Sequence, residues 1–530
     1  MYRTSSPGQL SFENFYLPFS GQLSVENRWV KLAELIPWEL VEAEYAEQFS
    51  PSMGAPAKSF RVALGALIIK EKLGISDEET VQQIRENPYL QYFLGFSEYR
   101  DQAPFDVSMM VHFRQRVNLE MVAQVNENIV CSMLAEPEPE TESPSSSVSG
   151  SSNNSNNNDA DGDASNHNDD DESPPPSNQG QLIMDATCAP ADIRYPTDLG
   201  LLNEARKNSE AILDRLYIQV SSKFKRKPRT YRKVARKAYL LVAKNRRPSR
   251  KQRRNAIRKQ LQYLRRNLRH IDALIAAEAS LSKLSRRQYR LLLVISEVYR
   301  QQTVMHETKA RRIDDRIVSI TQNYVRQRVR CKAGEPIEFG AKLSNSCVKG
   351  CVFLDVLSWD NFNESTHLQA QVEAYQRRFG YYPASVHADQ IYRTRDNRQW
   401  CKARGIRLSG PPLGRPKQDP TVQAELKQQA RQDEAVRVAV EGKFGQAKRR
   451  FSLARVMPKL AETAQCAIAI TFLVLNLERW LRQLLTLFFG LFARGRVALK
   501  CLIVACEVVN TTIGDFITSA GFKAIFTQAT

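Results

Sequence analysis

Apolar residues at helical spacing dominate the first part of the chain and predict an all-helical region over residues 1–134. Phe60–Leu73 has this spacing, and a further helix is expected over Val107–Val117. Ser76 and Glu79 have the spacing of a capping box, which predicts that another helix begins directly after Ser76. Short helices with tight breaks fit a DNA-binding module and an ordinary helical bundle equally well, so the pattern leaves both open.

Residues 135–180 interrupt this pattern with runs of Ser, Asn, Asp, Glu and Pro and almost no apolar side chain. Such a segment cannot bury enough apolar surface to offset the entropy lost on ordering, so we expect a disordered acidic linker. His167 and its neighbouring aspartates could bind a metal weakly, but a solvated linker is the favoured interpretation.

Two short β-type runs each have an aspartate at the C-terminal end of the predicted strand. Gln181–Asp185 ends in Asp185, and Ala384–Ala388 is followed directly by Asp389. In an open α/β sheet, the C-terminal ends of the strands form the edge at which sites are built. The sequence therefore predicts that Asp185 and Asp389 lie at one edge of a sheet.

The segments around these runs predict the rest of an α/β sheet. Ile337–Leu343 and Cys351–Ser358 are expected to form a hairpin with its turn at Ser344–Gly350. The apolar spacing of Ser365–Phe379 predicts an amphipathic helix that crosses over to the next parallel strand. Ile406–Ser409 is expected to follow as another short strand.

A long helix is predicted over Thr421–Phe451. Its apolar positions repeat at helical spacing and form one stripe, which consists of Val436, Val440, Phe444, Ala447 and Phe451. Arg437, Glu441 and Lys448 fall on a strip beside it. We therefore expect this helix to lie on the sheet, with Glu441 at the edge of the buried zone.

Residues 204–330 form a long helix-rich insert with a strong positive charge. Between Lys223 and Arg269 it holds 21 Lys and Arg residues and no Asp or Glu. Its apolar seam, which predicts a helix pair broken near Pro248, consists of Tyr239, Leu240, Ile257, Leu261, Leu264 and Leu268. A basic face without balancing acids repels itself, so phosphate binding is favoured over simple solvation. The candidate phosphate contacts are Arg253, Arg254, Arg258 and Lys259.

Composition narrows the class of protein. The net charge of +19 and the pI near 9.5 indicate a polyanionic partner, and the hydrophobic content of 42% is enough for packed cores. The 9 cysteines form no CxxC pair, which argues against a structural zinc site and suits a reducing cytosol. The N-terminus lacks the pattern of a signal peptide. Charged residues interrupt the apolar stretch Ala464–Gly490, so we expect a buried core helix and no membrane span.

Two strand-end aspartates and a glutamate on a helix are the ligands that two-metal phosphoryl chemistry requires. Mg²⁺ prefers hard oxygen ligands, and two ions about 3.5–4 Å apart can activate the attacking oxygen and stabilise the leaving one. Plainer interpretations exist: Glu441 could pair with Arg437 one turn away, and Asp185 could cap a turn. Asp355 is the rival carboxylate, expected on the solvent face, and His387 is expected to be structural.

At these residues the chain resembles a known family, the DDE-type transposases of bacterial insertion sequences, which have a ribonuclease H-like catalytic domain. The resemblance rests on DATCAPADIRYPTDLGLLNEAR, HADQIYRTRDNRQWCKARGIRLSGPPLGRPK and RVAVEGKFGQAKRRF. It implies that the metal-binding catalytic residues are Asp185, Asp389 and Glu441, holding two Mg²⁺ ions for which Mn²⁺ can substitute. It also suggests DNA contacts by Arg437 and Lys448. Related sequences often have Tyr where this chain has Glu434, which puts a tyrosine contact to DNA in doubt.

The expected fold class is mixed α/β, with a ribonuclease H-like core, a long basic helical insert, an N-terminal all-α domain and a C-terminal helical segment. The expected boundaries are 1–134 for the N-terminal domain, 135–180 for the linker, 181–203 and 331–455 for the core, 204–330 for the insert and 456–530 for the C-terminal region.

The resemblance implies metal-dependent cleavage and strand transfer at insertion-sequence ends. The expected partner is double-stranded DNA, as terminal inverted repeats and as target. We expect a homodimer on DNA in the bacterial cytoplasm, associated with the nucleoid and not with a membrane. Two alternatives remain open: a nuclease of the same fold that does not join strands, and a catalytically inactive DNA-binding derivative.

Overall fold

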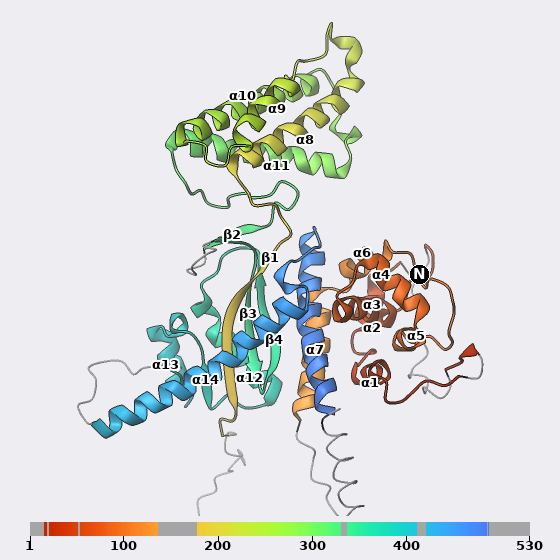
Figure 1. Cartoon of the computed structure of the whole chain (residues 1–530), viewed down its shortest axis with the longest axis vertical. Helices are drawn as coiled ribbons and strands as arrows, with labels where there is room; N and C mark the ends of the chain where they lie inside the picture. Colours follow the sequence, from red (N-terminus) through yellow and green to blue (C-terminus); the bar gives the residue numbers. More distant parts are fainter. Residues whose placement is uncertain are drawn as a thin grey trace, which may run out of the picture.

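The computed structural model describes residues 15–18, 21–50, 53–135, 177–329, 337–410, 420–484 and 486. Most of the predicted acidic linker, and the C-terminal region beyond residue 486, lie outside these ranges. In Figure 1 the helices of residues 28–134 lie to one side of a central sheet, and the helices of the basic insert gather above it.

Seven helices occupy the described N-terminal part, where the sequence predicts an all-helical region. They are α1 (Arg28–Leu35), α2 (Glu42–Glu47), α3 (Phe60–Leu73), α4 (Asp77–Glu86), α5 (Pro88–Phe93), α6 (Met109–Arg116) and α7 (Leu119–Leu134). The Ser76 side chain caps α4 by accepting a hydrogen bond from the Glu79 N–H at 3.1 Å. The Glu79 carboxylate accepts from Gln83, so the reciprocal half of the predicted capping box is not made.

The described strands form one mixed sheet, which confirms the mixed α/β class. They are β1 (Gln181–Pro190), β2 (Arg326–Val329), β3 (Ile337–Val348), β4 (Cys351–Ser358), β5 (Ser385–His387) and β6 (Arg407–Leu408). Their order is β2-β3-β1-β5-β6, and β4 pairs with β3 beside β2. β1 is antiparallel to β3 and parallel to β5, and β5 is parallel to β6.

Two strands are longer than the sequence pattern predicts. The expected end of β1 at Asp185 is wrong, because residues 186–190 continue in register with β3. A Cβ at Gly340 of β3 would lie 2.0 Å from the Ala189 carbonyl oxygen, so glycine permits this close pairing. Asp185 therefore lies within its strand.

The expected turn at Ser344–Gly350 is also too long, because β3 continues to Val348. The turn consists of Lys349 and Gly350, whose φ values of 45° and 82° suit a tight hairpin turn. The polar residues of the predicted turn, Ser344 to Ser346, are fully buried between β1 and β4. Their backbone groups are paired with strands on both sides, so these residues belong to the strand and not to a turn.

Helices cover both faces of this sheet. Buried side chains of α12 (Leu368–Phe379) and α13 (Arg395–Ala403) pack with Leu182, Met184 and Val386 on one face. The opposite face carries α14 (Pro420–Arg450), which crosses the sheet in Figure 1. The predicted stripe of α14 is confirmed: Val436 is partly buried and the other four residues are buried against that face.

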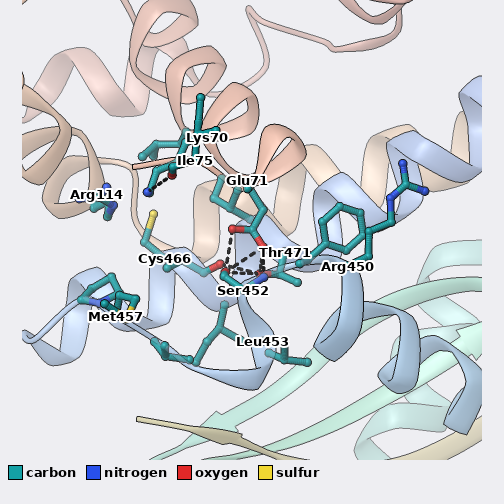
Figure 2. Close-up of a pocket in the computed structure, with 18 residues that line it drawn as sticks. Lys70, Glu71, Ile75, Arg114, Arg450, Ser452, Leu453, Met457, Cys466 and Thr471 are labelled. Carbon is teal, nitrogen blue, oxygen red and sulfur yellow. Dashed lines mark hydrogen bonds between the residues drawn. The ribbon is translucent and has the colours of Figure 1, made fainter. Parts of the chain in front are cut away.

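A further helix, Ala461–Leu484, joins the N-terminal helices to the sheet. It is long and apolar enough to cross a membrane, but 78% of its most apolar window is buried inside the protein, as predicted for a core helix. Glu71 of α3 accepts hydrogen bonds from Ser452, after α14, and from Thr471 of this helix at 2.7 Å (Figure 2). Glu71, Ser452 and Thr471 line a cavity of about 290 Å³.

The insert has a hydrophobic core of its own. Its helices are α8 (Asp198–Gln219), α9 (Arg232–Ala243), α10 (Arg250–Ala276) and α11 (Arg286–Thr308). The predicted break near Pro248 is confirmed, because α9 ends at Ala243 and α10 begins at Arg250. Leu261 and Leu264 of the predicted seam are buried in this core.

Candidate functional site

Asp185 and Asp389 occupy matching places on neighbouring parallel strands. β1 and β5 pair through Gln181 with Ser385, Leu182 with Val386 and Ile183 with His387. Both aspartates follow the last of these pairs by two residues, so they stand at the same level of the sheet. The two predicted strands that carry these aspartates to the sheet are therefore adjacent and parallel.

Asp185 is held in a largely buried position. Its Oδ1 accepts a hydrogen bond from the Ala186 N–H at 2.8 Å. Burial raises the pKa of Asp185 to about 6, while the Ala186 N–H and the Arg437 guanidinium act to lower this pKa. The carboxylates of Glu364 and Glu441 raise the same pKa further. The pKa of Asp185 therefore depends on charges on α14 and on the charge of Glu364, which follows β4.

Asp389 lies on the surface, two residues beyond the end of β5. Its Oδ1 accepts a hydrogen bond from the Gln390 N–H at 2.7 Å and caps the 3₁₀ turn Gln390–Tyr392. Both aspartates thus bond the N–H group of the next residue. The exposed carboxylate of Asp389 remains accessible to a ligand.

Arg437 of α14 links the acidic side chains of this edge. Its guanidinium contacts Glu441 Oε1 at 3.2 Å and Glu434 Oε1 at 2.7 Å. The hydrogen bond with Glu434 raises the pKa of Arg437 most, and the charges of Glu441 and Asp389 raise it further. Arg437 is therefore a positive charge that acts on Asp185 of β1, on Asp389 beyond β5 and on the glutamates of α14.

Glu441 is half-exposed, with a side-chain exposure of 51%, as expected for the edge of the buried stripe. The ion pair with Arg437 that the sequence suggested is present. Lys448 lies farther along α14, where its charge lowers the pKa of Cys188, a thiol whose pKa burial raises to about 12. The two basic residues thus affect different groups of β1: Arg437 lowers the pKa of Asp185, and Lys448 lowers the pKa of Cys188.

Across the described ranges, no three His, Cys, Asp or Glu side chains lie close enough together to form a metal-binding group. The chemistry of the donors nevertheless fits Mg²⁺, because Asp185, Asp389 and Glu441 all offer hard carboxylate oxygens. A further polar group faces Asp185: Asn345 lies opposite it in the β1–β3 ladder and is fully buried.

Asp355 corrects one expectation. The sequence placed it on the solvent face, but its side chain is only 6% exposed. Arg378 of α12 contacts Asp355 Oδ1 at 3.0 Å, and Gln371 donates to Oδ2 at 2.9 Å. The helix α12 brings these polar groups over the strand, so Asp355 faces α12 and not α14.

His387 of β5 lies beside α14. Its Nε2 lies 3.0 Å from the Ser385 hydroxyl, its Nδ1 lies 3.6 Å from Asp433, and burial lowers the pKa of the imidazole. Arg407 of β6 holds the Asp433 carboxylate through two hydrogen bonds of 2.9 Å each. The Arg407–Asp433 pair therefore fixes α14 to β6, while the His387 Nδ1 has no hydrogen-bond partner in the described residues.

Sequence reasoning missed Glu364 and Asn345. Glu364, paired with Lys342 at 2.8 Å, raises the pKa of Asp185 more than Glu441 does. It begins the short 3₁₀ helix Glu364–His367, which is too short for a periodic pattern to select it. Asn345 was hidden within the polar run interpreted as a turn.

The four basic residues singled out in the insert are exposed on α10. These are Arg253, Arg254, Arg258 and Lys259. The Arg254 guanidinium donates to the His306 carbonyl oxygen at 3.3 Å. The structure therefore leaves this face of the insert accessible to a large partner.

Two protein families match parts of this chain. Residues 386–478 match the family "Transposase DDE domain", and residues 18–116 match "Transposase domain (DUF772)". The resemblance to DDE transposases is thereby confirmed. The first match includes Asp389 and Glu441, whereas Asp185 and the basic insert lie outside both matches.

One curated relative is the "Uncharacterized protein ORF8 in nfe locus" of Rhizobium meliloti. It is 38% identical over 88 residues, which is 17% of this chain and 42% of that protein. The match thus spans less than half of the relative. No solved structure matches the chain.

Proposed function

We propose that this chain is a DNA transposase that cuts strands at the ends of an insertion sequence and joins them to target DNA. Asp185, Asp389 and Glu441 are its proposed catalytic residues. The observation that carries the proposal is the shared level of Asp185 and Asp389 on adjacent parallel strands. Glu441 of α14 adds a third carboxylate, which acts on Asp185 electrostatically.

The proposed core is ribonuclease H-like. If such a core is interrupted after its first strand, that strand must lie at the centre of the sheet, next to the strand that precedes Asp389. β1 lies between β3 and β5, and the helices of the insert follow it directly. In this scheme the N-terminal helices, the insert and the C-terminal helix are additions around the core, with the boundaries expected from sequence.

The proposed cofactor is a pair of Mg²⁺ ions, replaceable by Mn²⁺, with Asp185, Asp389 and Glu441 as ligands. When bound, such ions activate an attacking oxygen and stabilise the leaving oxygen of a phosphodiester. Arg437 reduces the repulsion among the carboxylates before DNA arrives. Its guanidinium can then offer paired N–H donors to a phosphate, an interaction that planar guanidinium groups favour.

The proposed partner is double-stranded DNA, both element ends and target, bound by a homodimer in the bacterial cytoplasm at the nucleoid. The exposed cations of α10 support this partner, because basic side chains without neighbouring acids favour phosphate contact. Arg437 and Lys448 are the proposed DNA contacts closer to the carboxylates.

The decisive experiment uses the full chain, Mg²⁺, labelled duplexes from the DNA flanking its gene, and a target plasmid. We expect cut ends with 3′-hydroxyl groups and labelled strands joined to the plasmid. Cutting without joining would favour a nuclease of the same fold. Binding without cutting would favour an inactive DNA-binding derivative, and either result would refute the proposed transposition.

A further inference from the structure

Asn345 is a buried amide beside Asp185 that has no hydrogen-bond partner. It lies in β3 directly opposite Asp185, and residues that face each other across an antiparallel pair point to the same side of the sheet. Its exposure is 0%. Neither Oδ1 nor Nδ2 finds a partner in the described part of the protein.

Two other buried asparagines are satisfied by the protein, and a third, Asn267, leaves only its Oδ1 without a partner in the described residues. Asn476, also 0% exposed, exchanges two hydrogen bonds with the backbone of Val352. Asn397 donates to the carbonyl oxygens of Ser365 and Tyr392. Because buried polar groups are rarely left unpaired, the two free atoms of Asn345 indicate a partner from outside the chain.

A purely structural role does not account for this amide. The register of β3 against β4 shifts between Ser344 and Asn345, but the Asn345 side chain makes no hydrogen bond that would hold the shift. Ser346, the next residue, is also buried with an unpartnered hydroxyl. It lies opposite Met184, on the other face of the sheet. Ser346 therefore provides a matched control for Asn345.

The neutral charge of an amide suits this position. Asp185 already lies near Glu364 and Glu441, whose charges disfavour its ionised form. Another acid at position 345 would increase that repulsion, whereas an amide adds an oxygen acceptor and an N–H donor without charge. Groups that bond the ligands and hydration shell of a bound ion commonly tune its affinity.

We propose that Asn345 is a positioning residue of the cation site, where its free amide would bond the hydration shell of a divalent ion held by Asp185. This inference rests on the proposed function, because it requires Asp185 to bind such an ion. It identifies a residue beyond the three carboxylates and places it on β3, a strand that supplies none of them.

The test measures binding of Mn²⁺ alone to the full chain, without DNA, together with the melting temperature in EDTA. Asn345→Ala should weaken Mn²⁺ binding about 10–100-fold. Its melting temperature without metal should be unchanged or higher, because the substitution removes an unpaired buried group. Ser346→Ala should leave Mn²⁺ affinity unchanged. Asn345→Ser replaces Asn345→Ala in both measurements should the alanine variant fail to fold.

Each other result contradicts a defined part of the inference. Wild-type Mn²⁺ affinity in the Asn345 variant would overturn the role of Asn345 and leave the proposed function standing. A lower melting temperature with unchanged affinity would make Asn345 structural. An equal loss of affinity in Ser346→Ala would show a general effect on the sheet. If the wild-type chain binds no Mn²⁺, the proposed function and this inference both fail.

Discussion

Asp185 and Asp389 stand at one level of the sheet because each follows the pair Ile183–His387 by two residues on parallel strands. The long insert between them in sequence therefore does not separate them in space. Backbone pairing fixes this relationship, so replacing either carboxylate by an amide should leave the sheet intact. Chemistry and folding can thus be tested separately at these positions.

We expect Asp389→Asn to abolish DNA cleavage and to leave DNA binding within about twofold. The exposed side chain bonds only the Gln390 N–H in the structure, and an amide oxygen can accept the same bond. The substitution removes the negative charge that a metal ion requires. Cleavage of element-end DNA and a gel shift on the same duplex measure the two effects. Cleavage at the wild-type rate would remove Asp389 from the site.

The pattern of apolar residues was sufficient to predict α14 and β5. The stripe from Val436 to Phe451 predicted how α14 packs, and the apolar run before Asp389 predicted β5. One face of α14 is buried against one neighbouring layer, so its helical period indicates the packing directly. All three residues of β5 are buried, as a short continuous run in a sheet covered on both faces allows.

The pattern failed where polar residues are buried through tertiary contacts. Ser344 to Ser346 have the composition of a turn, yet they lie in the middle of β3 because strands pair with both of its edges. Asp355 appeared suited to solvent, but Arg378 from a distant helix satisfies it. Such partners are set by long-range packing, which local periodicity does not encode.

The metal-free protein should respond to pH through Asp185. Its pKa is raised from 3.8 to about 6, so the folded state binds the proton more tightly than the unfolded chain. The resulting stabilisation is complete below about pH 4 and is lost as the pH rises through about 6. Asp185→Asn, which is always neutral, should therefore be more stable than wild type at pH 8, by on the order of 3 kcal/mol at most.

This difference should shrink as the pH falls towards 4. Melting temperatures in EDTA from pH 4 to 8 check it, with Asp389→Asn as the control because that carboxylate is exposed. A wild-type protein more stable than Asp185→Asn at pH 8 would contradict the raised pKa.

The exposed cations of α10 should contribute to the salt dependence of DNA binding. Replacing Arg253, Arg254, Arg258 and Lys259 by Gln should flatten the slope of log K against log salt by up to about 0.9 for each lost phosphate contact. Arg300→Gln is a control in the same insert, because Arg300 is already paired with Glu297 at 2.6 Å. An unchanged slope in the fourfold variant would show that this face does not contact DNA.

Asn476 should be important for stability, in contrast to Asn345. Its Oδ1 accepts from the Val352 N–H at 2.9 Å, and its Nδ2 donates to the Val352 carbonyl oxygen at 2.7 Å and to Asn126 at 2.8 Å. Asn476→Ala leaves the buried Val352 N–H unpaired, so we expect a loss of about 1–3 kcal/mol in unfolding free energy. Urea unfolding of Asn476→Ala and Asn345→Ala, both truncations of fully buried asparagines, measures the contrast. Equal losses of unfolding free energy in both variants would show that the hydrogen bonds of Asn476 add no stability beyond that of its buried side chain.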